Sequence, residues 1–192
     1  NQVIERLYAQ HLPAPFLSVL IEDCIARGKD YHAGGARYNT SYIMGVGPGT
    51  TTDSLSALRI HVFDRKALTM DEVLEALRAN FEGHERTRLL LLNRTPKYGN
   101  DEEYADRILA EVFEAFYDAV NGRKNTRGGL YRVNYLSTTC HVYFGSVTGA
   151  TPDGRKAWEP HSDGISPAQG ADRRGPTAVI RSAARMDHAR TG

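Results

Sequence analysis

The chain has 192 residues, of which 41% are hydrophobic and 24% are charged, and its net charge is +1. This is an ordinary globular composition, and it excludes a disordered tail, a collagen-like chain and a coiled coil. The balanced charge, without a basic block, argues against a nucleic-acid-binding surface. No apolar run approaches the roughly 20 residues that a membrane-spanning helix requires, so we expect no contact with a membrane.

The two cysteines, Cys24 and Cys140, form no Cys-x-x-Cys motif and are too few for a disulfide framework. A reducing cytoplasm is the compartment that this usage favours. Cys24 lies on an apolar helical stripe and Cys140 in a segment of β-forming residues, so both are expected to be buried structural thiols. Because the chain begins at Asn1, inside a helical pattern, we expect it to be part of a longer polypeptide.

The N-terminal third is expected to hold two helices and a long loop. Apolar residues at helical spacing predict helices over residues 2–9 and 15–27, separated by a proline-rich break. Residues 29–51 are rich in glycine and tyrosine, which predicts a structured loop with a short strand at 41–46. Loops of this length in a compact domain are usually functional or packed on another element.

The middle of the chain is predicted to be helical. Helices are expected over 53–63, 84–93 and 101–122, and another begins at a capping box formed by Thr69 and Glu72. The helix over 101–122 has the clearest apolar stripe, which consists of Tyr104, Ile108, Leu109, Val112, Phe113, Phe116 and Val120.

β-Branched and aromatic residues predict strand structure over 130–147, a turn at 151–154, a loop over 160–175 and a final helix over 176–189. The fold class is therefore α/β and rich in helix. One strand region cannot complete its own hydrogen-bonded ladder, which indicates a segment of a larger α/β body.

Local motifs give little direct evidence of chemistry. The loop Gly45-Val-Gly-Pro-Gly49 invites a nucleotide-binding interpretation, but no Gly-Lys-Ser/Thr follows it and Pro48 lacks an amide donor. We favour a tight backbone path at this loop and keep nucleotide binding as the alternative. No histidine pair has helical spacing with a third ligand nearby, so no metal site is predicted. On a strand, Cys140 and His141 would point to opposite faces.

The acidic residues are predicted to cap helices or close turns, because each stands where a carboxylate can accept from backbone amides. On this basis no group of residues forms a convincing catalytic constellation. The residues concerned are Asp53, Asp101, Asp153, Asp163 and Asp172.

Seven ordered motifs, taken together, resemble the glycyl radical enzymes, and in particular the dehydratases and lyases related to pyruvate formate-lyase. The similarity extends over almost all 192 residues. The motifs are Gly34-Gly-Ala-Arg-Tyr-Asn39, Thr52-Asp-Ser-Leu-Ser-Ala57, Asn80-Phe-Glu-Gly83, Pro96-Lys-Tyr-Gly-Asn-Asp101, Thr148-Gly-Ala-Thr-Pro-Asp-Gly-Arg155, Ser162-Asp-Gly-Ile-Ser-Pro167 and Gly175-Pro-Thr-Ala178.

The resemblance implies that residues 1–192 are a helix-rich segment of a ten-stranded α/β barrel. In that family a glycyl radical on one loop oxidises a cysteine on another loop, and the thiyl radical takes a hydrogen atom from a small-molecule substrate. A separate iron–sulfur activase that uses S-adenosylmethionine installs the radical. This sequence contains neither loop, so we expect the chain to bind no cofactor and to be inactive alone. The resemblance also implies that the complete enzyme is a homodimer.

Three further stretches resemble the branch of the family that dehydrates trans-4-hydroxy-L-proline to a pyrroline carboxylate. They are Thr40–Met44, Asn125–Gly129 and Leu136–Gly145. Other branches that share the general motifs are the glycerol and propanediol dehydratases, choline lyase, isethionate lyase and formate acetyltransferase. A stand-alone, non-catalytic module is the alternative outside the family's chemistry.

The resemblance also implies that Leu136 and Thr138 line the substrate pocket, with Thr139 as the alternative in the neighbouring register. A threonine hydroxyl can bond a carboxylate or hydroxyl group, and leucine can pack against a ring. Ordinary strand residues with high β propensity are the alternative interpretation of these threonines. Arg37 and Arg155 are expected to pin loops through carboxylates or backbone carbonyls.

Overall fold

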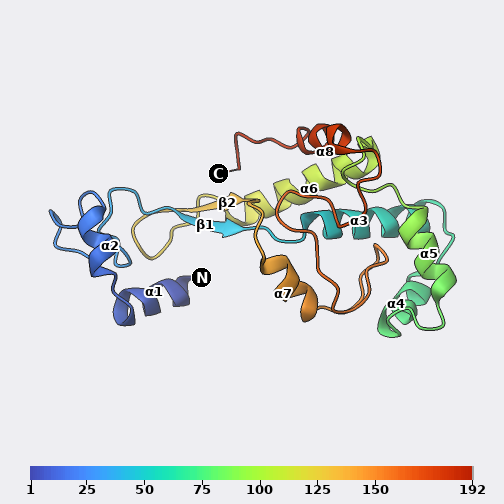
Figure 1. Cartoon of the computed structure of the whole chain (residues 1–192), viewed down its shortest axis with the longest axis horizontal. Coiled ribbons are helices and arrows are strands. Elements are labelled where there is room, and N and C mark those ends of the chain that lie inside the picture. The colour runs from blue at the N-terminus through green and yellow to red at the C-terminus, as the bar shows by residue number, and fades with distance from the viewer. Residues whose placement is uncertain (192) are drawn as a thin grey trace. The chain divides into compact units, whose positions relative to one another are not determined.

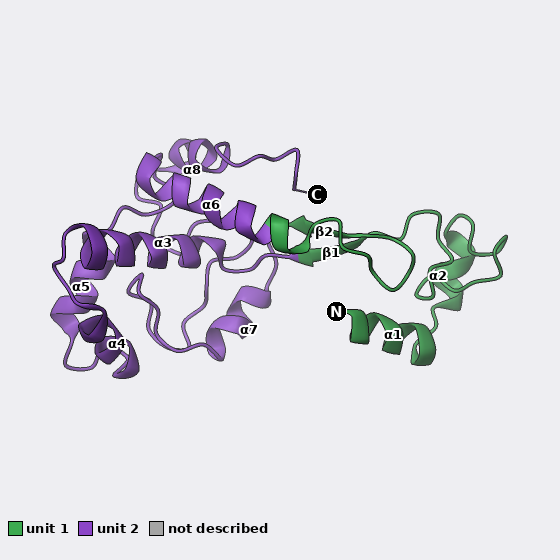
Figure 2. Cartoon of the chain, turned by 180° about the vertical axis from the view of Figure 1, so that it is seen from behind, with its two compact units in different colours: residues 1–43, 117–134, 192 green, residues 44–116, 135–191 purple. Residues whose placement is uncertain are grey.

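A computed structural model describes residues 1–191 and divides into two compact units (Figure 2). Unit 1 comprises residues 1–43 and 117–134, and unit 2 comprises residues 44–116 and 135–191. The chain therefore contributes two separate stretches to each unit. Figure 1 shows the order of the elements along the chain.

Unit 1 contains two short helices and a two-stranded sheet, of which only the last residue of β1, Met44, belongs to unit 2. Helix α1 spans Gln2–His11 and α2 spans Pro15–Leu20, while strand β1 at Ser41–Met44 pairs with β2 at Tyr131–Asn134. The expected strand at 41–46 is confirmed. The helix expected over 15–27 is shorter, because Ile21 adopts an extended conformation and residues 22–28 form turns.

The carboxylate of Glu5 ties α1 to both stretches of unit 1. It accepts hydrogen bonds from Ser41 Oγ at 2.5 Å, from Thr126 N at 3.0 Å and Oγ1 at 2.8 Å, and from Tyr131 Oη at 3.0 Å. Partial burial alone would raise the pKa of Glu5, but these hydrogen bonds outweigh it and lower that pKa.

Asn125 builds a tight turn that lies against the loop before β1. Its Oδ1 accepts from the amides of Arg127 and Gly129, and its Nδ2 donates to the carbonyl of Asn39 at 2.5 Å. A Cβ at position 129 would lie 2.5 Å from the carbonyl carbon of Asn39, so only glycine fits there.

Unit 2 is built from helices, and buried clusters of its described residues form its core. One cluster contains Ala57, Ala76, Phe81 and Leu91, and another contains Tyr98, Ala105 and Leu109. The elements are α3 (Pro48–Leu58), the π-helix η1 (Arg59–Asp64), α4 (Met70–Arg78), α5 (Glu85–Asn93), α6 (Glu103–Val120), α7 (Cys140–Ser146) and α8 (Pro176–Ala183). The last turn of α6 belongs to unit 1.

Local sequence signals explain several of these helices. The capping box before α4 is confirmed, because Glu72 N donates to Thr69 Oγ1 at 3.2 Å and Thr69 N donates to Glu72 Oε2 at 2.7 Å. The stripe on α6 is also confirmed in its inner part, where Ile108, Leu109 and Phe113 are buried. Burial of this stripe fixes which face of α6 meets the core.

Further predicted elements differ from the structure. The final helix, expected over 176–189, is α8 and ends at Ala183. Helix α3 begins at Pro48 rather than at residue 53, because proline suits the first turn of a helix. The strand predicted over 130–147 is wrong beyond Asn134, because residues 140–146 form α7. In the described part of the chain, no helix has both the length and the apolar character needed to cross a membrane.

Candidate functional site

The expected substrate-facing residues lie in a short irregular segment between β2 and α7, residues 135–139. Leu136 is 62% exposed, Thr139 is exposed and Thr138 is half-buried. Because this segment is not a strand, the expected alternation of faces does not apply to it. Leu136, Thr138 and Thr139 are neighbours on one irregular stretch of backbone, which we name the 135–139 segment.

Tyr135 anchors the beginning of the 135–139 segment in the core of unit 2. Its ring lies 5.8 Å from the ring of Phe113 and 5.9 Å from that of Phe116, between ring centroids. A Cβ at position 45 would lie 2.5 Å from Tyr135 Cδ1 and closer still to Cε1, so Gly45 leaves the space that the ring fills. The glycine-rich loop at 45–49 thus has a packing role, as the tight-path interpretation predicts.

The amides after this loop are also occupied by the chain itself. Thr50 N donates to Ser162 Oγ at 3.0 Å, and Ser162 N donates back to Thr50 Oγ1 at 2.9 Å. A Cβ at Gly49 would lie 2.9 Å from the carbonyl oxygen of Ser166. The start of α3 therefore packs against residues 162–166 rather than forming an open phosphate cradle.

Helix α7 follows the 135–139 segment and packs on residues 159–161. His161 N donates to the carbonyl of His141 at 3.3 Å, and a Cβ at Gly145 would lie 2.6 Å from Pro160 Cα. This tertiary packing overrides the β propensity of Val142, Tyr143 and Phe144. His141 Nδ1 lies 2.6 Å from the carbonyl oxygen of Thr138, and since a carbonyl only accepts, Nδ1 carries the proton.

The two cysteines differ in burial, although both were expected to be buried. Cys24 is buried, as predicted, whereas Cys140 is exposed at the first residue of α7. The prediction of a buried Cys140 is wrong because the helix turns its side chain out of the core. Within residues 1–191, no three His, Cys, Asp or Glu side chains are grouped so that they could hold a metal ion.

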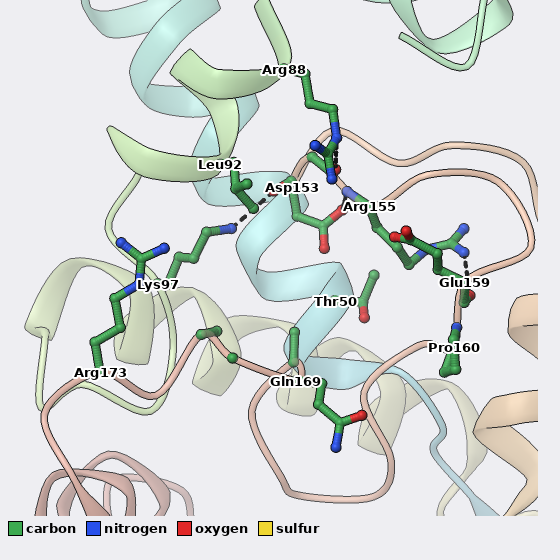
Figure 3. A pocket seen from close by; sticks show the side chains of 14 residues that line it. Thr50, Arg88, Leu92, Lys97, Asp153, Arg155, Glu159, Pro160, Gln169 and Arg173 are labelled. Carbon is green, nitrogen blue, oxygen red and sulfur yellow. Dashed lines mark hydrogen bonds between the residues drawn. The ribbon is translucent and has the colours of Figure 1, made fainter. Parts of the chain in front are cut away.

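A cavity of about 310 Å³ lies between α3, α5 and the loops around residues 153–160 and 168–173 (Figure 3). Its charged lining consists of Arg88, Lys97, Asp153, Arg155, Glu159 and Arg173. All four cations donate to oxygen atoms of the chain itself. Arg88 Nε donates to the carbonyl of Gly154 at 2.9 Å, and Arg173 Nη2 donates to Asn93 Oδ1 at 3.3 Å.

Arg155 is the most heavily engaged of these cations. Its Nη1 donates to the carbonyls of Lys156 at 3.0 Å and Glu159 at 2.6 Å, its Nη2 donates to the carbonyl of Gly149, and its Nε donates to Thr151 Oγ1 at 3.1 Å. Burial lowers the pKa of Arg155. The expectation that this arginine pins loops is confirmed, so the cavity wall is held together by its cations.

Arg37 has the corresponding role in unit 1. It bonds both carboxylate oxygens of Asp23, at 3.1 and 3.3 Å, and lies 2.9 Å from Glu22 Oε2. The hydrogen bond from Arg37 lowers the pKa of Asp23. The expected pairing of Arg37 with carboxylates is confirmed.

The sequence did not predict the buried pair of Asp53 and Lys97. Asp53 lies inside α3 with 0% exposure, so its predicted role as a helix cap or turn residue is wrong. Its Oδ2 lies 3.6 Å from Lys97 Nζ, and its Oδ1 accepts from Tyr98 N at 2.8 Å. Burial raises the pKa of Asp53 to about 7, against the opposing effect of the Lys97 charge.

Lys97 also donates to the carbonyl of Asp153 at 3.0 Å and so joins three of the sequence motifs. Asp53, Lys97 and Asp153 each belong to a different motif of the ordered series. The one signal in the sequence was that all three residues belong to motifs of that series. Polar residues in separate segments have no periodic pattern that would predict their contact.

The sequence matches the family described as pyruvate formate lyase-like over residues 1–145. The chain belongs to this family. Its helix-rich α/β structure also matches a crystal structure of a glycyl radical enzyme from Archaeoglobus fulgidus, with a TM-score of 0.89 and 40% sequence identity over 99% of this chain and 24% of that one.

Among individual relatives, the chain is 57% identical to trans-4-hydroxy-L-proline dehydratase of Clostridioides difficile, over all of this chain and 24% of that protein. The crystal structure of hydroxyproline dehydratase from the same organism, with trans-4-hydroxy-L-proline bound, matches with a TM-score of 0.92 over 100% of this chain and 24% of that one. Isethionate sulfite-lyase of Oleidesulfovibrio alaskensis is 42% identical over 95% of this chain and 22% of its own length. The chain thus spans about a quarter of the length of the relatives it matches.

Proposed function

We propose that this chain is the part of a glycyl radical dehydratase that presents substrate-facing side chains, and that the complete enzyme dehydrates trans-4-hydroxy-L-proline to a pyrroline carboxylate. The observation that carries the proposal is the 57% identity to a dehydratase of that substrate, compared with 36% to a sulfopropanediol dehydratase and 42% to an isethionate lyase. The match to that dehydratase covers 100% of this chain.

In this proposal the 135–139 segment faces the substrate. The Thr138 hydroxyl bonds the carboxylate or hydroxyl group of the amino acid, and Leu136 packs against its ring. Thr139 is the alternative for the hydroxyl role, because it is the neighbouring threonine on the same irregular backbone and is exposed. The exposure of Leu136 supports this role, since an apolar side chain that is 62% exposed is free to contact a ligand.

We further propose that residues 1–192 form part of a ten-stranded barrel and that the complete enzyme is a homodimer activated by an S-adenosylmethionine-dependent iron–sulfur enzyme. The glycyl radical supplies hydrogen-atom abstraction when it is present. This chain contributes binding and orientation, so the isolated chain is inactive. A cytoplasmic location is consistent with two free cysteines.

A chimeric enzyme tests the proposed substrate. The matching quarter of the Clostridioides difficile dehydratase is replaced by this chain, and the product is activated anaerobically. We expect conversion of trans-4-hydroxy-L-proline and none of glycerol or isethionate. A chimeric enzyme that carries the radical, measured by electron paramagnetic resonance, but does not turn over hydroxyproline would contradict the proposal.

Substitutions in the 135–139 segment test the proposed roles within the chimeric enzyme. Thr138→Val removes the hydroxyl at nearly constant shape, and loss of a hydrogen bond to a charged group is expected to raise KM by about tenfold. Thr139→Val is the register alternative, and Thr177→Val, on the exposed surface of α8, is the matched control. If Thr138→Val and Thr139→Val both behave like the control, the segment does not bind substrate through its hydroxyl groups.

A further inference from the structure

Residues 159–165 run along the 135–139 segment and hold the chain on both sides of it. On the far side, α7 packs on residues 159–161 through Gly145 and the bond from His161 N to the carbonyl of His141. On the near side, Ile165 N donates to the carbonyl of Tyr135 at 3.0 Å. Residues 136–139 therefore connect two points at which the main chain is held in place.

At the near point the two backbones touch directly at Gly164. A Cβ at this position would lie 2.6 Å from the carbonyl carbon of Leu136 and 2.7 Å from its oxygen, and closer still to the carbonyl oxygen of Tyr135. These are main-chain atoms, which cannot move aside as a flexible side chain can. Any side chain at 164 must displace the start of the 135–139 segment by about 1 Å to reach ordinary contact distances.

The loop that carries Gly164 is itself fixed from the core. Tyr98 Oη donates to the carbonyl of Ile165 at 2.8 Å, and Tyr98 is 0% exposed. The backbone of Tyr98 is held in turn by Asp53 Oδ1 at 2.8 Å. A series of direct contacts therefore connects the buried Asp53 on α3 to the main chain of Tyr135 and Leu136.

We propose that Gly164, supported by Tyr98, is a positioning residue for the substrate-facing segment. This inference rests on the proposed function of that segment. Gly164 touches no substrate. It sets the distance between two backbones and thereby the place of the Leu136 and Thr138 side chains. Because a displacement of about 1 Å at a reacting centre costs about 10²-fold in rate, a single methyl group at 164 is expected to be sufficient to disable the site.

The test is Gly164→Ala in the chimeric enzyme, with Gly149→Ala as the matched control. A Cβ at 149 meets no atom within 4 Å, and neither glycine has a positive φ, so the two substitutions differ in crowding alone. We expect kcat/KM for hydroxyproline to fall by about 10²-fold in Gly164→Ala, with the radical content per chain retained. Gly149→Ala is expected to match the unsubstituted chimeric enzyme.

A double-mutant cycle separates positioning from a general loss of structure. If Gly164→Ala displaces the segment, the Thr138 hydroxyl no longer reaches the substrate, so adding Thr138→Val has no further effect. Full additivity of the two substitutions would overturn the proposal. So would a folded Gly164→Ala enzyme with kcat/KM within twofold of the control.

Tyr98→Phe provides a second variant in case Gly164→Ala does not fold. It keeps the buried ring and removes only the hydrogen bond to Ile165, and we expect a rise of about threefold to tenfold in KM. An unchanged KM in Tyr98→Phe, with Gly164→Ala unfolded, would assign Gly164 to folding alone and overturn the proposal. The proposed function fails separately, if Thr138→Val and Thr139→Val have no effect in the unsubstituted chimeric enzyme.

Discussion

Glu5 in unit 1 and Asp53 in unit 2 are carboxylates that connect distant parts of the chain, and the two lie in opposite electrostatic environments. Glu5 in unit 1 accepts four hydrogen bonds from three residues, and its pKa is lowered. Asp53 in unit 2 accepts one hydrogen bond and lies 3.6 Å from one ammonium group, and burial raises its pKa to about 7.

Hydrogen-bond donors lower the pKa of a carboxylate and loss of solvent raises it, so the balance of the two decides the direction in which the pKa moves. At Glu5 the donors outweigh the desolvation, whereas at Asp53 complete burial outweighs a single ion pair. Glu5 therefore stabilises unit 1 through its charge. Asp53 is tolerated in unit 2 because Lys97 and the Tyr98 amide compensate for part of the cost of burying it.

The largest expected effect comes from removing the compensating cation. Above the Asp53 pKa of about 7, Lys97→Met leaves a buried carboxylate without its partner, which is expected to lower the free energy of unfolding of unit 2 by up to about 3–5 kcal/mol. Urea unfolding followed by circular dichroism measures this change. Lys156→Met, at an exposed position of the same unit, is the control. Equal behaviour of the two variants would mean that Lys97 does not compensate for Asp53.

The stabilities of the two units are expected to change with pH in opposite directions. Folded unit 2 keeps a proton on Asp53 up to about pH 7, whereas an unfolded aspartate loses it near pH 4, so stability falls as pH rises between these values, by up to about 1.4 kcal/mol per pH unit. The lowered pKa of Glu5 stabilises unit 1 above the ordinary glutamate pKa, and this contribution is lost as pH falls through the folded value.

Native-state hydrogen exchange of peptides from each unit, corrected for intrinsic rates, measures both slopes. Asp53→Asn is expected to abolish the slope of unit 2 between about pH 4 and pH 7, and Asp71→Asn, at an exposed site on α4, to preserve it. A slope that survives Asp53→Asn would assign the effect to another group.

Glu5→Gln is expected to have an intermediate effect. The amide keeps one acceptor oxygen but places a donor where the hydroxyl groups of Thr126 and Tyr131 now donate, so unit 1 should lose about 1–3 kcal/mol. Exchange of the Thr126 amide measures the loss, and Glu75→Gln on α4 is the control. An unchanged Thr126 amide would show that Glu5 does not hold the two stretches of unit 1 together.

The smallest effect is expected at a surface pair. Glu22 is 75% exposed at its side chain where it meets Arg37, and such pairs contribute little because solvent screens them. Glu22→Gln should leave the unfolding midpoint of the chain unchanged within error. A loss as large as that of Glu5→Gln would mean that exposure does not separate these two carboxylates.

The sequence predicted the elements that depend on local chemistry. The capping box of Thr69 and Glu72 and the apolar stripe of α6 are short-range patterns, and the structure contains both. Helix α7 was mispredicted because its β-forming residues fold as a helix against residues 159–161, which begin 13 residues beyond its end (159 − 146).

The candidate site likewise has features that the sequence predicts and features that it does not. The pinning role of Arg155 was predictable, since arginine in a turn finds carbonyl oxygens within a few residues. The pairing of Asp53 with Lys97 was not, because it joins a helix to a loop 44 residues further along the chain (97 − 53). The crowding at Gly164 was also hidden, since a glycine in the sequence does not show what lies beside it.

The contact at Gly164 also has a consequence for substitutions in the 135–139 segment. It is made to main-chain atoms of Tyr135 and Leu136, and every amino acid has those atoms. Mutation can therefore exchange the side chains of positions 136 and 138 while the frame that presents them stays constant. Relatives at 36% and 42% identity are a sulfopropanediol dehydratase and an isethionate lyase. Under the proposed function, substitutions at positions 136 and 138 would change the side chains offered to the substrate without removing the main-chain contact that holds them.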